Sequence, residues 1–98
     1  MQALLSGDLL TGKIAIVTGA GRGIGEGIAR ALAEREATVV CGDVNEADAS
    51  RVAADLGHGA IGRKLDVSNS QACDDFVNAV REQFGRLDIL VNNAGINR

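Results

Sequence analysis

Short apolar runs alternate with longer amphipathic segments along most of this 98-residue chain. Residues 13–18, 38–41, 60–67 and 87–92 form runs rich in β-branched and aliphatic side chains, as buried strands do. Between these runs, apolar residues recur at helical spacing. Such alternation favours parallel pairing through right-handed crossovers, because each helix carries the chain back across a face of the sheet. The pattern therefore predicts an α/β fold with the element order βαβαβαβ.

Capping residues indicate where two of the helices begin and end. Asn45 precedes the helical segment 46–56 and Gly57 follows it, as an N-cap and a C-terminal stop. Ser68, with Gln71 three residues later, has the capping-box pattern and predicts the start of the third helix.

A glycine-rich loop, TGAGRGIG at 18–25, separates the first run from the first helical segment. Ile24, Ile28 and Leu32 recur at helical spacing, and the helix is expected to open near Gly23. A helix that starts after such a loop offers backbone N–H groups and positive potential to a pyrophosphate, which glycines allow to come close. The common GxGxxG spacing is absent, and glycines alone also fit a flexible turn without a ligand.

Asp43 stands at the end of the second run, roughly 20 residues beyond the loop. In a doubly wound sheet, an acidic residue there accepts hydrogen bonds from the adenosine ribose hydroxyls. Its charge would repel a 2′-phosphate and so favours NAD over NADP, whereas Arg22 beside the phosphates would help to hold NADP. The alternative is that Asp43 only initiates the next helix. With the glycine loop after the first strand, we expect a partial Rossmann fold with the parallel strand order 3-2-1-4.

The chain resembles the short-chain dehydrogenase/reductase family over nearly its whole length after Leu10. The glycine loop matches the family's TGxxxGxG pattern, and a second family signature, NNAG, stands at 92–95. Asp66 and Val67 match an Asp-Val pair that the family places beside the adenine. The phrase GRLDILVNNAGINR resembles the 3-oxoacyl-[acyl-carrier-protein] reductase-like branch. The residues that match TGxxxGxG are Thr18, Gly19, Gly23 and Gly25.

The resemblance implies a nicotinamide dinucleotide cofactor and a role for each matched residue. The loop would cradle the pyrophosphate, and Asp43 would bind the adenosine ribose. The Asp-Val pair would line the adenine pocket, and the NNAG signature would pass under the nicotinamide-side ribose. Asn92 is expected to be structural. The implied cofactor-binding residues are Gly19, Arg22, Gly23, Ile24, Gly25, Asp43, Asp66, Val67, Asn93, Ala94 and Gly95.

Catalysis in the family resembled here is carried by a YxxxK motif, an upstream Ser and an Asn after NNAG. The 98 residues contain no Tyr, so we expect no catalytic residue and no turnover in this chain. It resembles the N-terminal, cofactor-binding portion of a longer oxidoreductase that interconverts a small carbonyl compound and a secondary alcohol. Residues 1–12 would form a loose arm and residues 13–98 a partial dinucleotide-binding domain without its catalytic half. The alternative is a non-catalytic nucleotide-binding or self-associating half-domain.

Composition narrows the remaining classes of function. Hydrophobic residues make up 46% and charged residues 23%, which is ordinary for a globular domain. The net charge is −3 and no Lys/Arg run occurs, so neither nucleic acid nor an anionic membrane is an expected partner. No apolar stretch approaches membrane-spanning length, and the first residues do not have the pattern of a secretion signal, so we expect a cytoplasmic protein.

A few further residues invite interpretation. Cys41 and Cys73 stand in no CxxC or Cys/His cluster, so no metal site is expected, and Cys41 should be a small core residue. His58, between two glycines, is expected in an exposed turn. The fourth strand would leave an apolar sheet edge, which predicts self-association or a homo-oligomer.

Overall fold

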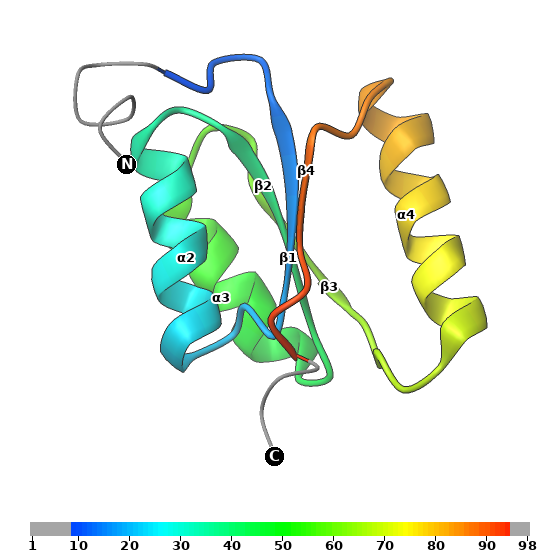
Figure 1. Ribbon diagram of the computed structural model, residues 1–98. Helices are drawn as coiled ribbons and strands as arrows, with labels where there is room; N and C mark the ends of the chain where they lie inside the picture. Colours follow the sequence, from blue (N-terminus) through cyan, green and yellow to red (C-terminus); the bar gives the residue numbers. More distant parts are fainter. Residues whose placement is uncertain (1–8, 95–98) are drawn as a thin grey trace.

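The fold is a parallel sheet between two helical layers, seen in a computed structural model that describes residues 9–94. Figure 1 shows that α2 and α3 cover one face of the sheet and α4 covers the other. The strand order is β3-β2-β1-β4, which confirms the predicted order 3-2-1-4. The strands are β1 (Ile14–Thr18), β2 (Thr38–Asp43), β3 (Ile61–Lys64) and β4 (Ile89–Val91), and the helices are α2 (Gly23–Glu34), α3 (Glu46–Leu56) and α4 (Ser70–Phe84).

The central strand β1 is buried along its whole length. Its residue Ile16 pairs with Val40 of β2 on one side and with Leu90 of β4 on the other. Because side chains alternate across a strand, Val17 packs into the core beneath α2 and α3, whereas Ile16 packs into the core beneath α4. Cys41 is fully buried in the first of these cores, as predicted.

Small residues form the buried face of α2. Its buried positions are Gly25, Ala29 and Ala33, which are spaced by one helical turn and let the helix lie close to the sheet. The predicted apolar residues contribute less: Ile28 and Leu32 pack at the margin of this core. Ile24 is 65% exposed.

The predicted ends of α3 are confirmed. The Asn45 side chain accepts a hydrogen bond from the backbone N–H of Asp48 at 3.1 Å. Gly57 ends the helix with a φ of +71°, in the region that favours glycine.

The predicted start of α4 is wrong by one residue. Asn69, not Ser68, is the N-cap, and its side chain accepts the N–H of Ala72 at 2.9 Å. The reason is local, because the Ser68 hydroxyl donates instead to Asp66 Oδ1 at 2.6 Å.

β3 and β4 are each at least three residues shorter than the predicted runs 60–67 and 87–92. β3 ends at Lys64, because the chain then enters a turn before α4. The N–H of the next residue, Leu65, still donates to the Asp43 carbonyl at 2.9 Å. β4 begins at Ile89 and ends at Val91, and the residue before it, Asp88, is bound to Ile14 through its backbone and its carboxylate.

Residues 9–12, the part of the predicted N-terminal arm that the structure describes, contact the domain. The N–H of Leu10 donates to the Arg35 carbonyl at 2.6 Å, and its side chain packs against the core beneath α2. Thr11 donates to Glu36 at 2.7 Å. Within residues 9–94, none of the helices combines the length and the apolar character needed to span a membrane.

Candidate functional site

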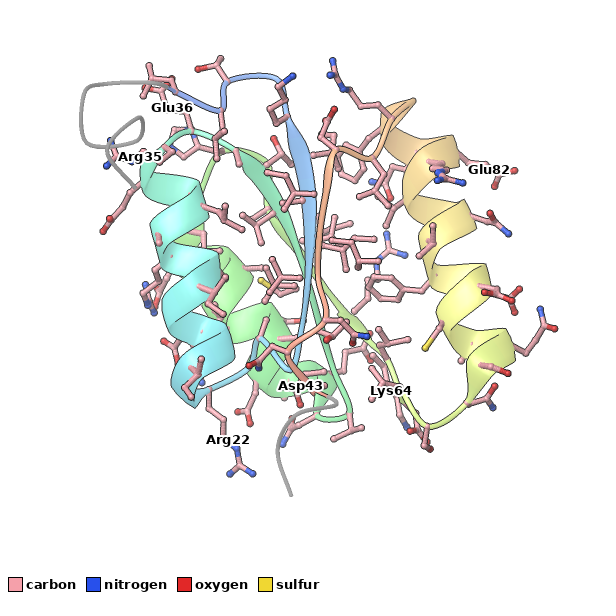
Figure 2. The ribbon with its side chains drawn as sticks, in the orientation of Figure 1. Arg22, Arg35, Glu36, Asp43, Lys64 and Glu82 are labelled. Carbon is pink, nitrogen blue, oxygen red and sulfur yellow. The ribbon has the colours of Figure 1, made fainter. Side chains whose placement is uncertain are left out.

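A cleft of about 310 Å³ opens beside the carboxyl ends of β1 and β2. Ligands of open α/β sheets bind at this end, where the connections leave the strands. Figure 2 shows Arg22 and Asp43 at this end of the sheet, with the Arg22 side chain extending away from the ribbon. The lining residues are Gly19, Arg22, Asp43, Val44, Leu65, Val67 and Ala94.

The glycine loop takes its shape from residues with left-handed backbone conformations. Gly19 has a φ of +66° and Gly23 a φ of +61°. A Cβ placed on Gly23 would meet no atom within 4 Å, so the space outside this residue is open to a ligand. Gly25 differs, because a Cβ there would overlap the carbonyl group of Gly19. The glycine at 25 therefore lets α2 pack against the loop from which it starts.

The N-terminus of α2 has no side-chain cap. Its N-cap residue, Arg22, makes no capping hydrogen bond, whereas Asn45 and Asn69 cap α3 and α4. The first N–H groups of a helix have no intrahelical acceptor, and the helix dipole makes this end positive. The N-terminus of α2, with the exposed Arg22 guanidinium beside it, therefore suits an anionic group.

Asp43 lines the cleft and contacts the glycine loop directly. Its Oδ2 accepts the N–H of Gly21 at 2.9 Å, and its Oδ1 accepts the N–H of Asn45 at 3.0 Å. Asp43 thus holds the loop and also shapes the turn into α3, as the alternative interpretation expected. A carboxylate oxygen can accept more than one hydrogen bond, so these contacts leave acceptor capacity for ribose hydroxyls.

Thr18 connects the first signature to the second. Its hydroxyl accepts the N–H of Ala94 at 3.0 Å and lies 3.3 Å from Asn92 Oδ1. These contacts place the segment after β4 directly beside the glycine loop. They agree with a structural role for Asn92.

Asn93 lies beneath the glycine loop and is only 4% exposed. Its Nδ2 is 3.5 Å from the Gly19 carbonyl oxygen, a long hydrogen bond, and its Oδ1 has no partner among the described residues. A buried acceptor without a partner is unusual in a folded protein. Gly95, the last residue of the predicted site, lies outside the described residues.

The other predicted site residues are not all in the cleft. Val67 lines it, whereas the predicted residues outside the lining are Gly23, Ile24, Gly25, Asp66 and Asn93. The Asp66 carboxylate accepts both the hydroxyl and the backbone N–H of Ser68, and these hydrogen bonds hold the pKa of Asp66 below its ordinary value.

One residue that contacts the loop was not among the predicted site residues. Arg51, on α3, donates from Nη2 to the carbonyl oxygen of Gly21 at 2.9 Å. No local pattern marks this arginine, because its partner lies far away in the sequence and the contact exists only once α3 packs beside the loop.

The described residues contain no cluster of His, Cys, Asp and Glu side chains suited to a metal ion. His58 is exposed, with a φ of +54°, in the turn that precedes β3. This turn lies at the amino end of the strand, away from the cleft, and its exposure agrees with the prediction.

The sheet order and the cleft at the carboxyl ends of β1 and β2 define an α/β protein of the Rossmann type. Within that class, residues 13–98 match the family model described as short chain dehydrogenase, and the chain belongs to this family.

Individual relatives agree with this assignment. The chain is 46% identical over 89 residues to the 3-oxoacyl-[acyl-carrier-protein] reductase of Vibrio cholerae, covering 91% of this chain and 36% of the relative. It is 48% identical over 87 residues to galactitol 2-dehydrogenase of Agrobacterium fabrum, covering 89% of this chain and 34% of the relative.

A solved structure also matches. It is the crystal structure of 3-ketoacyl-(acyl-carrier-protein) reductase from Brucella melitensis complexed with NADH. The TM-score is 0.77 and the identity 43%, over 83% of this chain and 33% of that chain. This chain therefore spans 33–36% of the length of these relatives. The match confirms the predicted resemblance and the predicted fold.

Proposed function

We propose that this chain binds the adenosine diphosphate portion of a nicotinamide dinucleotide in the cleft beside β1 and β2. The observation that carries the proposal is the uncapped N-terminus of α2, which opens onto that cleft directly after a loop shaped by Gly19 and Gly23. Membership of the short-chain dehydrogenase family supports it, as does the NADH in the similar Brucella structure.

The residues of the cleft fit the parts of such a ligand. The backbone at Gly23 and the first turn of α2 would receive the diphosphate, because the space outside Gly23 is open. Asp43 would accept hydrogen bonds from the adenosine ribose. The apolar side chains of Val44, Leu65 and Val67 would pack against the adenine. The predicted contacts of Asp66 and Ile24 remain part of the proposal, although neither lines the cleft.

The NNAG segment would lie under the nicotinamide-side ribose. Ala94 lines the cleft, and the buried Oδ1 of Asn93 lacks a partner among the described residues. The bound nicotinamide would supply hydride transfer to or from carbon. We propose that the whole protein uses this hydride transfer to interconvert a carbonyl compound and a secondary alcohol, as the resemblance to longer oxidoreductases implies. Because the 98 residues contain no Tyr, we expect them to show negligible dehydrogenase activity alone.

The binding experiment is a titration of the purified chain with NADH, followed by nicotinamide fluorescence. The chain has no Trp or Tyr, so protein emission interferes little. We expect saturable binding that ADP displaces. An absence of binding by a sample that still melts cooperatively would contradict the proposal for this chain.

A pair of glycine variants tests the place of binding. Gly23→Val and Gly85→Val both put a side chain at a positive φ, with no atom within 4 Å of the new Cβ. Gly85 ends α4 at the opposite end of the sheet, so it controls for backbone strain. We expect a loss of NADH affinity of about tenfold or more for Gly23→Val only. Equal losses in the two variants would count against a phosphate site at the loop.

We also propose that the cofactor is NAD rather than NADP. The support is the carboxylate of Asp43 in the cleft, where it would repel a 2′-phosphate; the exposed Arg22 works in the opposite direction. Asp43→Asn removes the charge while it keeps the shape of the side chain and one of its two acceptor oxygens. We expect the preference for NADH over NADPH to shrink by roughly tenfold. If the wild-type chain bound NADPH more tightly, the preference for NAD would be wrong.

A further inference from the structure

Gly21 occupies a position where the family pattern TGxxxGxG does not require glycine. Its φ is not among the positive values, so its backbone conformation does not require glycine either. The small space around Gly21 does require glycine. A Cβ on Gly21 would lie 2.8 Å from Asp48 Cβ and 2.9 Å from Asp43 Oδ2. The glycine therefore lets the loop backbone lie directly against the end of β2 and the first turn of α3.

This close approach allows both backbone groups of Gly21 to be held. Its N–H donates to Asp43 at 2.9 Å, and its carbonyl oxygen accepts from Arg51 at 2.9 Å. The two partners come from different elements, Asp43 from β2 and Arg51 from α3. Arg51 is in turn 3.8 Å from Asp48, one turn earlier on the same helix.

The contact with Arg51 has a consequence for the next residue. The carbonyl of Gly21 and the N–H of Arg22 belong to one peptide unit, and the described chain has no cis peptide bond. In a trans peptide these two groups point in opposite directions. When Arg51 holds the carbonyl toward α3, the N–H of Arg22 points away from α3. Arg22 lines the cleft and is the N-cap of the uncapped helix α2.

We propose that Arg51 is a positioning residue of the dinucleotide site. It holds the Gly21 carbonyl toward α3 and thereby orients the N–H of Arg22, at the start of the helix that would receive the diphosphate. Arg51 does not line the cleft and its side chain is 53% exposed, so it acts through the loop rather than on the ligand. This inference rests on the proposed function and adds a residue to that site.

The first test compares Arg51→Met with Arg30→Met. Arg30 is a matched control, because it is a half-exposed arginine on α2 whose partners, Glu26 and Asp55, do not belong to the loop. Each chain is titrated with ADP and with adenosine, followed by NMR chemical shifts. For Arg51→Met we expect ADP affinity to fall about three- to tenfold and adenosine affinity to change by less than about twofold. Arg30→Met should leave both unchanged.

The second test needs no ligand. Amide hydrogen exchange at Gly21 reports how readily its N–H leaves Asp43, which the loop allows more often when α3 no longer holds the Gly21 carbonyl. In Arg51→Met we expect faster exchange at Gly21 and unchanged exchange in β1, and Arg51→Lys, which retains a donor, should recover part of the protection. Weaker ADP binding with unchanged Gly21 exchange would mean that Arg51 acts through its charge alone, which would overturn the inference.

The remaining outcomes separate this inference from the proposal beneath it. If wild-type chain binds ADP and Arg51→Met binds it equally well, the site is correct and the role of Arg51 is wrong. An equal loss of ADP and adenosine affinity would indicate general destabilisation and would also overturn it. If the wild-type chain binds neither ADP nor NADH, the proposed function fails for this chain and the positioning role fails with it.

Discussion

At the scale of single residues, the glycines of the loop serve two different physical purposes. Gly19 and Gly23 supply backbone conformations that other residues avoid, whereas Gly21 and Gly25 supply space; Gly19 does both, because a Cβ there would lie 3.0 Å from Asn93 Nδ2. The sequence shows only that glycines are dense. The purpose of each depends on neighbours such as Asp48, which lie far away along the chain.

Substitutions at two glycines of α2 should have opposite effects on stability. In Gly25→Ala the new Cβ would overlap the Gly19 carbonyl, so we expect the free energy of unfolding to fall by about 1–3 kcal/mol. In Gly27→Ala the Cβ would meet nothing within 4 Å on the exposed side of the same helix, so we expect a gain of roughly 0.5–1 kcal/mol. Urea unfolding of both variants checks this. A stable Gly25→Ala chain would mean that the loop can move away from α2 at little cost.

Residues that belong to local patterns were predictable from the sequence, and residues that act across the fold were not. Gly19, Arg22, Asp43, Val67 and Ala94 meet in the cleft as the motifs implied. Arg51 carries no such signal, because its contact with Gly21 depends on how α3 packs.

At the scale of elements, the sequence predicts the ends of helices more accurately than the ends of strands. The bounds of α3 follow from Asn45 and Gly57, because these residues cap its two ends through local backbone conformation and hydrogen bonds. The start of α4 was misplaced because two neighbouring residues can both cap, and Asp66 engages the hydroxyl of Ser68. The ends of β3 and β4 depend on where partner strands stop, which no local pattern records.

The junction of β1 and β4 should make stability depend on pH. The Asp88 carboxylate accepts hydrogen bonds from Arg86 and from the N–H of Ile14, and these lower its pKa below the ordinary 3.8. Folding therefore favours the ionised form. This contribution is present above pH 3.8 and is lost as the pH falls through the lower pKa of the folded state.

Asp88→Asn should therefore reduce the loss of unfolding free energy as the pH is lowered from neutral to below 3.8. Asp74→Asn, at an exposed position on α4, controls for the removal of one negative charge. Urea unfolding at a series of pH values gives the comparison. If the two variants show the same pH dependence, the hydrogen bonds of Asp88 do not couple protonation to folding.

At the scale of the whole molecule, the two faces of the sheet are covered unequally. Among residues 9–94, two helices, α2 and α3, lie on one face and one helix, α4, lies on the other (Figure 1). Beside α4 an apolar groove of about 90 Å³ runs along β1 and β4, and its wall includes Ile16, Phe76, Val77 and Leu90. Leu90 is 56% exposed, although it is central in β4. Within residues 9–94, β4 pairs with β1 only, so its other side is a sheet edge.

An apolar strand at a sheet edge is a template for pairing with another chain. We therefore expect the 98-residue chain to self-associate as its concentration rises, and Leu90→Lys to shift it toward the monomer, because a charge at the edge opposes pairing. Leu9→Lys is the control, since Leu9 is 52% exposed but lies outside the sheet. Size-exclusion chromatography with light scattering measures the mass of each species. A wild-type chain that stays monomeric at every concentration would show that the β4 edge does not pair with another chain. Equal effects of the two substitutions would indicate association through general surface hydrophobicity rather than through this edge.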